Sequence, residues 1–502
     1  MKILSATQLK EADKYTIDNE PILPINLMER AAGLCANRIM ELSSPAAIHY
    51  VFCGKGNNGA DGLAIARMLA SAKRKVEVFV IEYTDQSTGE FATNFKRIDT
   101  QSFATIHSIK KTTEIKLPKK ENTIIIDALI GTGINKPVEG LLAEVIDFIN
   151  QSGIPVISID MPSGLPCDSN TASETIIKAG KILSFHAPKL TFLFADFYQY
   201  AGDFEILDIG LIRSFTETLP GNYAILTKQI IKNLITSRPK FSHKGTFGHA
   251  LLLAGSKDKM GAALLAAKAC LRSGAGLLTT HIPSCGCQSM QTALPEAMVN
   301  IDDNKDYISA YPHIIAYSAA AIGPGIGKEK ETAQVLKVLI QETKTPLVID
   351  ADAINILAEN KTWISFLPSG TVLTPHPKEF DRLCGTHTSD FERLQTCKEF
   401  AFKHKLIIVL KGTYTAIVCP DNRVFFNSTG NAALAKGGSG DVLTGIILGL
   451  MTRGYNPQTA SMIGVYLHGL AADLYTKKYS RETMLAGDLI NILQTAFTII
   501  ED

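Results

Sequence analysis

Short apolar runs alternate along the chain with longer segments in which apolar residues recur every three or four positions. The short runs predict buried strands, and the longer segments predict amphipathic helices. Strands that alternate with helices indicate parallel sheets covered by helices on both faces. In the first half we predict strands at 48–53, 76–81, 123–128, 156–159 and 205–208, and helices from Ser5 to about 15, at 27–42, up to about 72 and at 141–149.

The same alternation resumes after a polar stretch at 214–222, which contains Pro220-Gly221 and predicts a linker. The pattern therefore predicts two α/β domains in tandem. In the second half we predict strands at 249–254, 276–282, 314–319, 347–349, 372–374 and 406–410, helices at 262–272, 332–341 and 442–451, and a hairpin formed by 416–419 and 424–427.

Length and composition agree with this division. A chain of 502 residues is too long for one ordinary core, and 46% hydrophobic with 20% charged residues is typical of a well-packed soluble protein. The net charge of +1 gives no electrostatic reason to expect nucleic acid or an anionic membrane as a partner. No signal-peptide pattern and no apolar run near the roughly 18 residues of a membrane span is present. The nine scattered cysteines predict reduced, buried thiols in a cytoplasmic protein.

A glycine-rich run in the second half carries the clearest chemistry. Residues 437–440 are Gly-Gly-Ser-Gly and lead directly into Asp441 and an apolar pattern of helical spacing. Free backbone N–H groups and the positive end of the dipole at such a helix start bind anions such as phosphate. Asp441 lies at the same end and can accept a proton from a hydroxyl, which indicates phosphoryl transfer to an alcohol. The alternative is a structural turn that Asp441 merely caps.

A second glycine-rich run, Gly-Lys-Gly-Asn-Asn-Gly at 54–59, matches the dinucleotide fingerprint GxGxxG between a predicted strand and helix. A dehydrogenase of that type requires an acidic residue at the end of the next strand. Glu77 lies inside that strand and Glu82 comes late, so a dehydrogenase is the weakest interpretation.

Two more loops in the first half, at 127–137 and 160–164, carry polar residues beyond strand ends. In a doubly wound sheet such ends line one crevice, where ligands bind. Separate caps and turns are the alternative, but a buried carboxylate is costly unless it is paired or ligated. The oxygen donors of Asn58, Asp127 and Ser163 suit a hard cation better than zinc or copper.

These three loops resemble the NAD(P)H-hydrate epimerase family, the YjeF N-terminal domain, through the runs 57–62, 131–133 and 160–164. The resemblance implies a Rossmann-like fold that interconverts the R and S epimers of hydrated NADH and NADPH. It implies that Asp160 is the acid/base and that Asn58, Asp127 and Ser163 hold a potassium ion. It also implies that the dinucleotide is bound by Asn57, Asn58, Gly59, Ala60, Asp61, Gly131, Thr132, Gly133, Ile134, Asn135, Lys136, Pro137 and Asp160.

Chemistry-bearing residues follow one predicted strand after another in the second half. Each residue alone is equally well explained as a turn or a solvated strand end, but their joint arrangement predicts a site. They are Gly255, Gly261, Ala262, Gly323, Gly325, Asp350, Asp352, His376, Glu379 and Lys411.

Residues 374–379, 411–413 and 431–443 resemble the ADP- or ATP-dependent NAD(P)H-hydrate dehydratase family of the ribokinase-like superfamily. The resemblance implies that phosphate is transferred from ADP or ATP to the ring hydroxyl and then eliminated, with Asp441 as the base. It implies magnesium on the nucleotide phosphates, water ordered by Glu379, and a hydrate pocket lined by Ala262, Gly325, His376 and Asp441. The implied nucleotide-binding residues are Lys411, Gly412, Thr413, Tyr414, Thr415, Asn431, Gly437, Gly438, Ser439 and Gly440.

Both resemblances together cover nearly the whole chain. They imply a bifunctional repair enzyme, an isomerase and a lyase in one chain, with a Rossmann-like three-layer domain at 1–215 and a ribokinase-like domain at 225–502. A ribokinase-type small-molecule kinase with a regulatory first half, or a non-enzymatic binding protein, remains an alternative. We expect a homo-oligomer without a nucleic-acid or membrane partner. The sequence leaves open ADP against ATP and NADH against NADPH.

Overall fold

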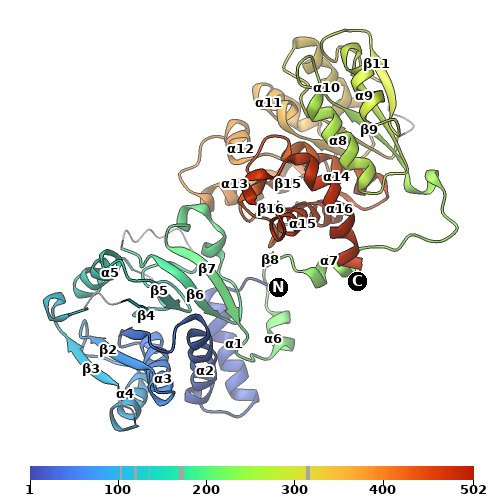
Figure 1. Ribbon diagram of the computed structural model, residues 1–502. Coiled ribbons are helices and arrows are strands. Elements are labelled where there is room, and N and C mark those ends of the chain that lie inside the picture. Colours follow the sequence, from blue (N-terminus) through green and yellow to red (C-terminus); the bar gives the residue numbers. More distant parts are fainter. Residues whose placement is uncertain (102–103, 118–120, 135, 169–174, 313–316, 502) are drawn as a thin grey trace. The chain divides into compact units, whose positions relative to one another are not determined.

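The computed structural model describes residues 1–501 apart from 102–103, 118–120, 135, 169–174 and 313–316 (Figure 1). The chain divides into two compact units, Lys2–Gly221 and Asn222–Asp502 together with Met1. Both are α/β structures, which confirms the predicted fold class of two tandem α/β domains. No helix in the described part of the chain is long and apolar enough to cross a membrane.

The first unit is built on a seven-stranded parallel sheet in the order β3-β2-β1-β4-β5-β6-β7. The order reverses at β1, which pairs with both β2 and β4, so a ligand crevice is expected beyond these strands. The strands are β1 (Ile48–Cys53), β2 (Lys75–Ile81), β3 (Thr105–Ile109), β4 (Thr123–Ala128), β5 (Val156–Ile159), β6 (Ala179–Phe185) and β7 (Ala201–Leu207). The helices are α1 (Ala6–Asn19), α2 (Pro24–Leu42), α3 (Asn57–Ser71), α4 (Gly89–Gln101), α5 (Leu141–Gln151) and α6 (Arg213–Thr218).

The second unit contains a ten-stranded sheet in the order β11-β10-β9-β12-β13-β14-β15-β16-β17-β8. Its strands are parallel except where β16 pairs with β15 and β17. The strands are β8 (Tyr223–Ile225), β9 (His249–Leu253), β10 (Leu277–Pro283), β11 (Met298–Asp302), β12 (Ala319–Ile322), β13 (Leu347–Ile349), β14 (Val372–Leu373), β15 (Ile407–Leu410), β16 (Ala416–Val418) and β17 (Val424–Phe426). The helices are α7 (Lys228–Leu234), α8 (Met260–Arg272), α9 (Cys287–Ala293), α10 (Lys330–Glu342), α11 (Ala351–Glu359), α12 (Pro377–Cys384), α13 (Asp390–His404), α14 (Ser439–Thr452), α15 (Pro457–Thr476) and α16 (Ala486–Glu501).

Alternate residues of the central strands face two separate cores. Leu252 of β9 belongs to the core that includes α8, α14, α15 and α16, whereas Leu253 belongs to the core that includes α10 and α11. This period of two, with apolar residues on both faces, is typical of a parallel sheet between helical layers. The second unit is therefore a three-layer structure.

Helix α14 approaches α8 more closely than side chains would permit. A Cβ at Gly445 would lie 2.1 Å from the carbonyl oxygen of Ala266, and one at Gly449 would lie 2.4 Å from that of Cys270. The two helices run in parallel register, because Gly445 faces Ala266 and one turn later Gly449 faces Cys270. One turn earlier in each helix, the same register places Asp441 of α14 opposite Ala262 of α8.

Most predicted elements are present. Ser5 caps α1 and forms a capping box with Gln8, and the predicted hairpin is the pair β16 and β17. The strand predicted at 314–319 agrees with β12 only at Ala319: residues 317–318 precede that strand, and residues 314–316 lie outside the described residues. The predicted linker contains α6. All nine cysteines are free, as predicted, but Cys285 is exposed.

Candidate functional site

The first candidate site lies at the carboxyl ends of β4 and β5 in the first unit. Asp127, in β4, is fully buried and accepts four hydrogen bonds. Its Oδ1 accepts from the Ser163 hydroxyl at 2.6 Å and from the N–H of Leu129 at 3.3 Å, while Oδ2 accepts from the Ser158 hydroxyl at 2.7 Å and the N–H of Ser163 at 2.9 Å. Burial raises the pKa of Asp127, and the hydrogen bonds from Ser163 oppose that rise. The loops 129–131 and 160–164 are thus joined through one carboxylate.

Asn58 is the unpaired polar group of this site. It is buried in the first turn of α3, and neither its Oδ1 nor its Nδ2 has a hydrogen-bond partner among the residues that the structure describes. A Cβ at Gly59 would lie 1.8 Å from the carbonyl oxygen of Gly54, so α3 starts in backbone contact with the loop after β1. A Cβ at Gly131 would lie 3.3 Å from the Asn58 Cβ, which places the amide against the loop after β4. A buried amide left unpaired is costly and indicates a missing ligand.

Asp160 directly follows β5 in a left-handed backbone conformation, with φ of +62°. Its Oδ1 accepts from Lys189 Nζ at 2.7 Å, the N–H of Phe185 at 3.1 Å and the Ser184 hydroxyl at 3.3 Å. A non-glycine residue in this conformation is strained, and such strain gathers at functional sites. Asp160 is therefore held from one side by the loop after β6.

Two further carboxyl groups lie near Asp160. Burial raises the pKa of Asp61 well above its usual value, and the charges of Asp160 and Asp13 raise it further. Burial also raises the pKa of Asp13, to about 6, with Asp160 adding to the effect and Lys189 opposing it. Asp61 lies in the first part of α3 and Asp13 in α1. This region thus combines one carboxylate paired with lysine and two neighbouring carboxyl groups whose pKa values are raised.

The remaining residues predicted to bind the dinucleotide lie on the rim of the same edge. Asn57 is exposed at the start of α3, while Gly59 and Ala60 are buried behind it. Gly131, Thr132 and Ile134 are half-buried in the loop after β4, and Gly133, Lys136 and Pro137 of that loop are exposed. Asn135 lies outside the described residues.

The second candidate site lies at the carboxyl ends of β12 to β15 in the second unit. Lys411, which follows β15, places its Nζ 3.1 Å from Asp350 Oδ1 and 3.8 Å from Glu379 Oε2. Asp350 follows β13, is 1% exposed, and accepts a hydrogen bond from the Thr444 hydroxyl of α14 at 2.7 Å. The N–H of Lys411 also donates to the carbonyl of Pro375 after β14, at 2.9 Å. Three strand ends and α14 are therefore tied to one buried ion pair.

Asp441 is the third residue of α14 and lies beside this ion pair. Burial raises the pKa of Asp441 to about 6, with a contribution from Asp350, while Lys411 lowers it. A base whose pKa lies close to the working pH combines availability with proton affinity, which is the condition for general-base catalysis. Asp441 thus has the electrostatic environment of a base.

The glycine turn before Asp441 places backbone next to the lysine. Gly438 caps α14 with φ of +91°, a conformation that favours glycine, and a Cβ at Gly440 would lie 3.5 Å from Lys411 Nζ. The helix start and an ammonium therefore face the same space, where an anion is stabilised by both. The Ser439 hydroxyl instead donates back to the carbonyl oxygens of Leu434 at 2.9 Å and Lys436 at 3.0 Å.

The other residues predicted to bind the nucleotide differ in exposure and in whether their side chains already have hydrogen-bond partners. The Asn431 side chain is already used, because its Nδ2 donates to Asp473 Oδ1 at 2.8 Å and its Oδ1 accepts from the N–H of Ala433 at 3.1 Å. Gly412 and Thr415 close the loop after β15 through a hydrogen bond of 3.2 Å. Gly437, Gly412 and Thr413 are exposed, while Tyr414 and Thr415 are half-buried.

The residues predicted to line the hydrate pocket come from two places. Gly325 has φ of +65°, and a Cβ there would lie 3.1 Å from the Ala262 Cβ, so the loop after β12 contacts the start of α8. His376 and Glu379 form a capping box at the start of α12: Glu379 Oε2 accepts the N–H of His376 at 2.8 Å, and His376 Nδ1 accepts that of Glu379 at 3.2 Å. Burial lowers the pKa of His376. Glu379, through its contact with Lys411, joins this group to the ion pair.

Sequence reasoning missed the contacts of two residues that the structure places centrally. Asp350 was named only as one of the strand-end candidates, and its pairing with Lys411 was not predicted. Lys189 carried no signal, because its contact with Asp160 depends on the path of the loop after β6. Glu82, considered for a dehydrogenase, pairs with Lys55 and accepts from the Ser108 hydroxyl at 2.8 Å.

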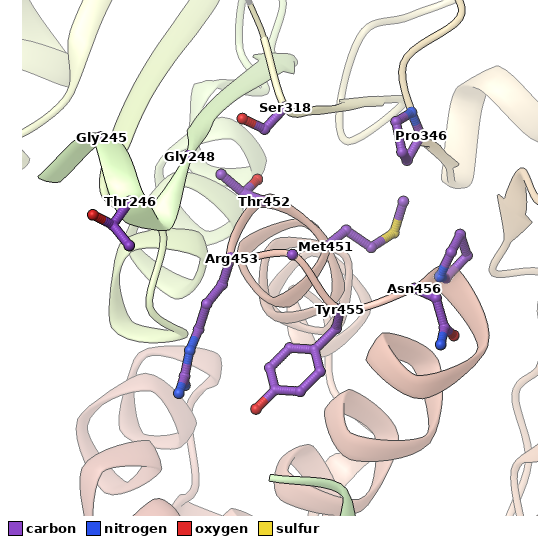
Figure 2. Close-up of a pocket in the computed structure, with 12 residues that line it drawn as sticks. Gly245, Thr246, Gly248, Ser318, Pro346, Met451, Thr452, Arg453, Tyr455 and Asn456 are labelled. Atoms are coloured by element: carbon purple, nitrogen blue, oxygen red, sulfur yellow. The ribbon is translucent and has the colours of Figure 1, made fainter. Parts of the chain in front are cut away.

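Two cavities open at the opposite, amino-terminal edges of the sheets. One, of about 440 Å³, lies between the end of α14 and the residues that precede β9, β12 and β13 (Figure 2). Its polar side chains are engaged: Arg453 donates to the carbonyl of Thr236, and the Tyr455 hydroxyl accepts from the N–H of Thr236 at 2.8 Å. The other, of about 660 Å³, lies before β1, β4 and β5. In parallel sheets ligands bind at the other edge, so we assign neither cavity a ligand.

Comparison with known proteins covers both units. The family model described as YjeF-related protein N-terminus matches residues 24–191, and the model described as NAD(P)H-hydrate dehydratase matches residues 250–495. A bifunctional NAD(P)H-hydrate repair enzyme of Moorella thermoacetica is 32% identical over 520 residues, which span 100% of this chain and 98% of the relative.

Solved structures match the second unit. An ADP/ATP-dependent NAD(P)H-hydrate dehydratase from Bacillus subtilis, co-crystallised with ATP and Mg²⁺, is 35% identical with a TM-score of 0.49, and the match covers 56% of this chain and 99% of that one. A hypothetical protein from Streptococcus mutans is 30% identical with a TM-score of 0.50, covering 55% and 100%. The sequence matches extend over both units. The chain belongs to the family of bifunctional NAD(P)H-hydrate repair enzymes.

Proposed function

We propose that this chain repairs hydrated NADH and NADPH. The first unit interconverts the R and S epimers of the hydrate, and the second uses ADP or ATP to dehydrate the S form back to NAD(P)H, releasing phosphate. Membership of the family supports both activities. The single observation that carries the proposal is the position of Asp441, beside Lys411 and Asp350 at the start of α14.

Asp441 takes the proton of the ring hydroxyl as that oxygen attacks the terminal phosphorus of the nucleotide. The phosphorus–oxygen bond to the nucleotide breaks, leaving AMP from ADP or ADP from ATP. The carbon–oxygen bond of the phosphorylated ring then breaks, inorganic phosphate departs with the former hydroxyl oxygen, and loss of a ring proton restores the double bond. The glycine turn stabilises the charge on the migrating phosphoryl group.

We further propose that the nucleotide lies along residues 411–415 and 437–440, with Asn431 shaping the loop rather than binding directly. Its phosphates would carry Mg²⁺. The carboxyl groups of Asp350, Glu379 and Asp441 all act on the single ammonium of Lys411, so this corner carries excess negative charge that suits a divalent cation. Among the described residues no three His, Cys, Asp or Glu side chains are grouped to hold a metal. Magnesium held by phosphates and water, which Glu379 would order, fits that finding.

In the first unit we propose that residues 57–61 and 131–137 bind the dinucleotide hydrate and that Asp160 is the acid/base. Potassium would be held by Asn58, Asp127 and Ser163, which offer amide, carboxylate and hydroxyl oxygens. The buried, unpaired Asn58 amide supports a ligand there. A bound cation would supply positive charge next to the phosphates of the dinucleotide and hold the three loops together.

The potassium proposal predicts a change in stability. At potassium about tenfold above its Kd, binding to the native state adds about 1.4 kcal/mol, which raises the Tm of a unit this size by a few degrees. We expect KCl to raise the Tm of the first unit above that in NaCl at equal ionic strength, and Asn58→Ala to abolish the difference. Asn57→Ala, an exposed neighbour, is the control and should keep it. A difference that persists in Asn58→Ala would contradict the assignment.

The proposed function itself is tested by adding the whole chain to an epimer mixture of hydrated NADPH with ADP or ATP and Mg²⁺. We expect the absorbance of NADPH to recover completely, because the R form is drawn into the S form. Recovery of only the S fraction would contradict the epimerase half. A stable phosphate ester without recovery would instead favour a small-molecule kinase, and no turnover at all would favour a binding protein. Running ADP and ATP separately identifies the donor.

A further inference from the structure

Lys189 is a fully buried lysine in the loop after β6, and its ammonium is completely hydrogen-bonded. It donates to Asp160 Oδ1 at 2.7 Å, to the Ser184 hydroxyl at 2.8 Å and to the carbonyl oxygen of Phe185 at 3.0 Å. An ammonium has three donors, so none remains for a ligand. Any influence of Lys189 on the reaction must therefore pass through its partners.

Stability alone does not account for such a pair. Removing a lysine from water is costly, and a buried ion pair is often no more stable than apolar residues of the same volume. The pair also anchors a strained residue, because Asp160 has φ of +62° and is fixed additionally by the N–H of its own residue, which donates to the carbonyl of Leu183 at 2.8 Å. A costly pair that holds a strained carboxylate at a ligand-facing edge indicates a functional role.

All the hydrogen bonds that Asp160 accepts from described residues go to one oxygen, Oδ1. The second oxygen, Oδ2, is therefore the one that the carboxylate presents to the crevice, and the side chain is 15% exposed. We propose that Lys189 is the positioning residue of the epimerase site: its ion pair with Oδ1 keeps the Asp160 carboxylate turned so that Oδ2 alone meets the hydrate. This inference rests on the proposed epimerase function.

The ion pair between Lys189 and Asp160 distinguishes Asp160 from the other acidic groups around it. The titratable groups around Asp160 are Asp13 of α1, Cys35 of α2, Asp61 of α3, and Cys167 and Lys189 on the loops after β5 and β6. Of these groups it is Asp160 that forms the ion pair with Lys189, while burial and the Asp160 charge raise the pKa of Asp13 to about 6 and that of Asp61 well above its usual value. When Asp160 takes the proton of the ring hydroxyl, the carbon–oxygen bond becomes a carbonyl as the bond from that carbon to the ring nitrogen breaks. The nitrogen then adds back to the other face of the carbonyl and the oxygen regains a proton, which inverts the carbon.

The test compares Lys189→Met with Asp160→Asn and with the double variant, in the full-length chain. Without the cation the carboxylate takes up a proton more readily, so in Lys189→Met the acid limb of the epimerisation pH profile should move up by about one to three pH units. kcat at pH 7 should fall about 100-fold, with KM within about threefold of wild type, because Lys189 does not touch the ligand. The double variant should have the same kcat as Asp160→Asn alone, because the effect of Lys189 on kcat passes through Asp160.

Ser184→Ala keeps the charge and removes one anchor of the ammonium, so it serves if Lys189→Met does not fold. Because the Ser184 hydroxyl also donates to Asp160 Oδ1, this variant should lower kcat several-fold and move the acid limb in the same direction as Lys189→Met but by less. An unmoved acid limb and unchanged kcat in Lys189→Met, or a raised KM alone, would overturn the role of Lys189. Wild type that does not interconvert epimers would contradict the proposed function instead. In that case the role of Lys189 is tested by ¹³C NMR titration of the Asp160 carboxyl in wild type and in Lys189→Met. Identical titration curves in the two proteins would overturn the inference.

Discussion

Asp441→Asn is expected to reduce nucleotide-dependent dehydration by about 10²–10⁴-fold while epimer interconversion continues at the wild-type rate. The amide keeps the shape of the side chain and can still cap α14, but it cannot accept the hydroxyl proton. Dehydration is followed by recovery of NADPH absorbance from the pure S hydrate. Epimer interconversion is followed separately, by chromatography of the two forms.

The chain offers a matched control for this substitution. Asp488 is the third residue of α16, as Asp441 is of α14, and its Oδ2 accepts the N–H of Leu485 at 2.8 Å. If Asp441 only capped its helix, Asp441→Asn and Asp488→Asn would both change stability slightly and leave turnover alone. Retention of more than about a tenth of the wild-type rate in Asp441→Asn would remove the base from the mechanism.

The pH dependence follows from the same residue. A base acts only when it is deprotonated, and burial with the Asp350 charge raises the pKa of Asp441 to about 6. The wild-type dehydration rate should therefore fall as the pH drops through about 6. This limb should vanish in the residual activity of Asp441→Asn.

Gly440→Val is expected to reduce dehydration by roughly 10²–10³-fold, the effect of removing a donor that stabilises a transition-state anion. A Cβ at position 440 lies 3.5 Å from Lys411 Nζ, so the valine side chain enters the space between the helix start and the ammonium. The phosphoryl group can then no longer approach the backbone N–H groups. Initial rates at saturating nucleotide measure the effect, and circular dichroism checks the fold.

Gly487→Val is the matched control, because Gly487 is the second residue of α16, as Gly440 is of α14, and a Cβ there meets nothing within 4 Å. The helix-propensity cost of valine is then the same in both variants. Equal activity of the two variants would show that the glycine turn does not contact the phosphoryl group.

Local signals explain which parts of the fold were predictable. The strands at Ile48–Cys53 and Thr123–Ala128 were predicted to the residue, since each is a short apolar run ended by glycine or acid. By contrast, β6 contains Gly180 and Lys181, and β3 is an edge strand with polar residues, so neither has an apolar run that propensity can detect. Helices α15 and α16 were missed although their apolar residues are plentiful. For α15 a start signal was present and overlooked, because Asn456 caps the helix and Pro457 is its first residue.

Residues at strand ends could be predicted as candidates, because topology brings such positions together. The contacts that these residues make could not be predicted. Asn431 was predicted to touch the nucleotide, yet its amide is bonded to Asp473, distant in sequence. Asp350 and Lys189 acquire their importance from partners on other strands, and such pairings depend on the sheet order, which a single sequence does not specify.

The backbone contact between α8 and α14 limits how the second unit can respond to its ligands. Helices in contact at Gly445 and Gly449 cannot slide past one another without a clash, so Asp441 and Ala262 belong to one rigid block. Adjustment to different nucleotides is then expected from loops at this edge, such as 411–415, rather than from these two helices. A change of donor preference during evolution can then proceed by remodelling that loop, without disturbing the alignment of base and hydrate.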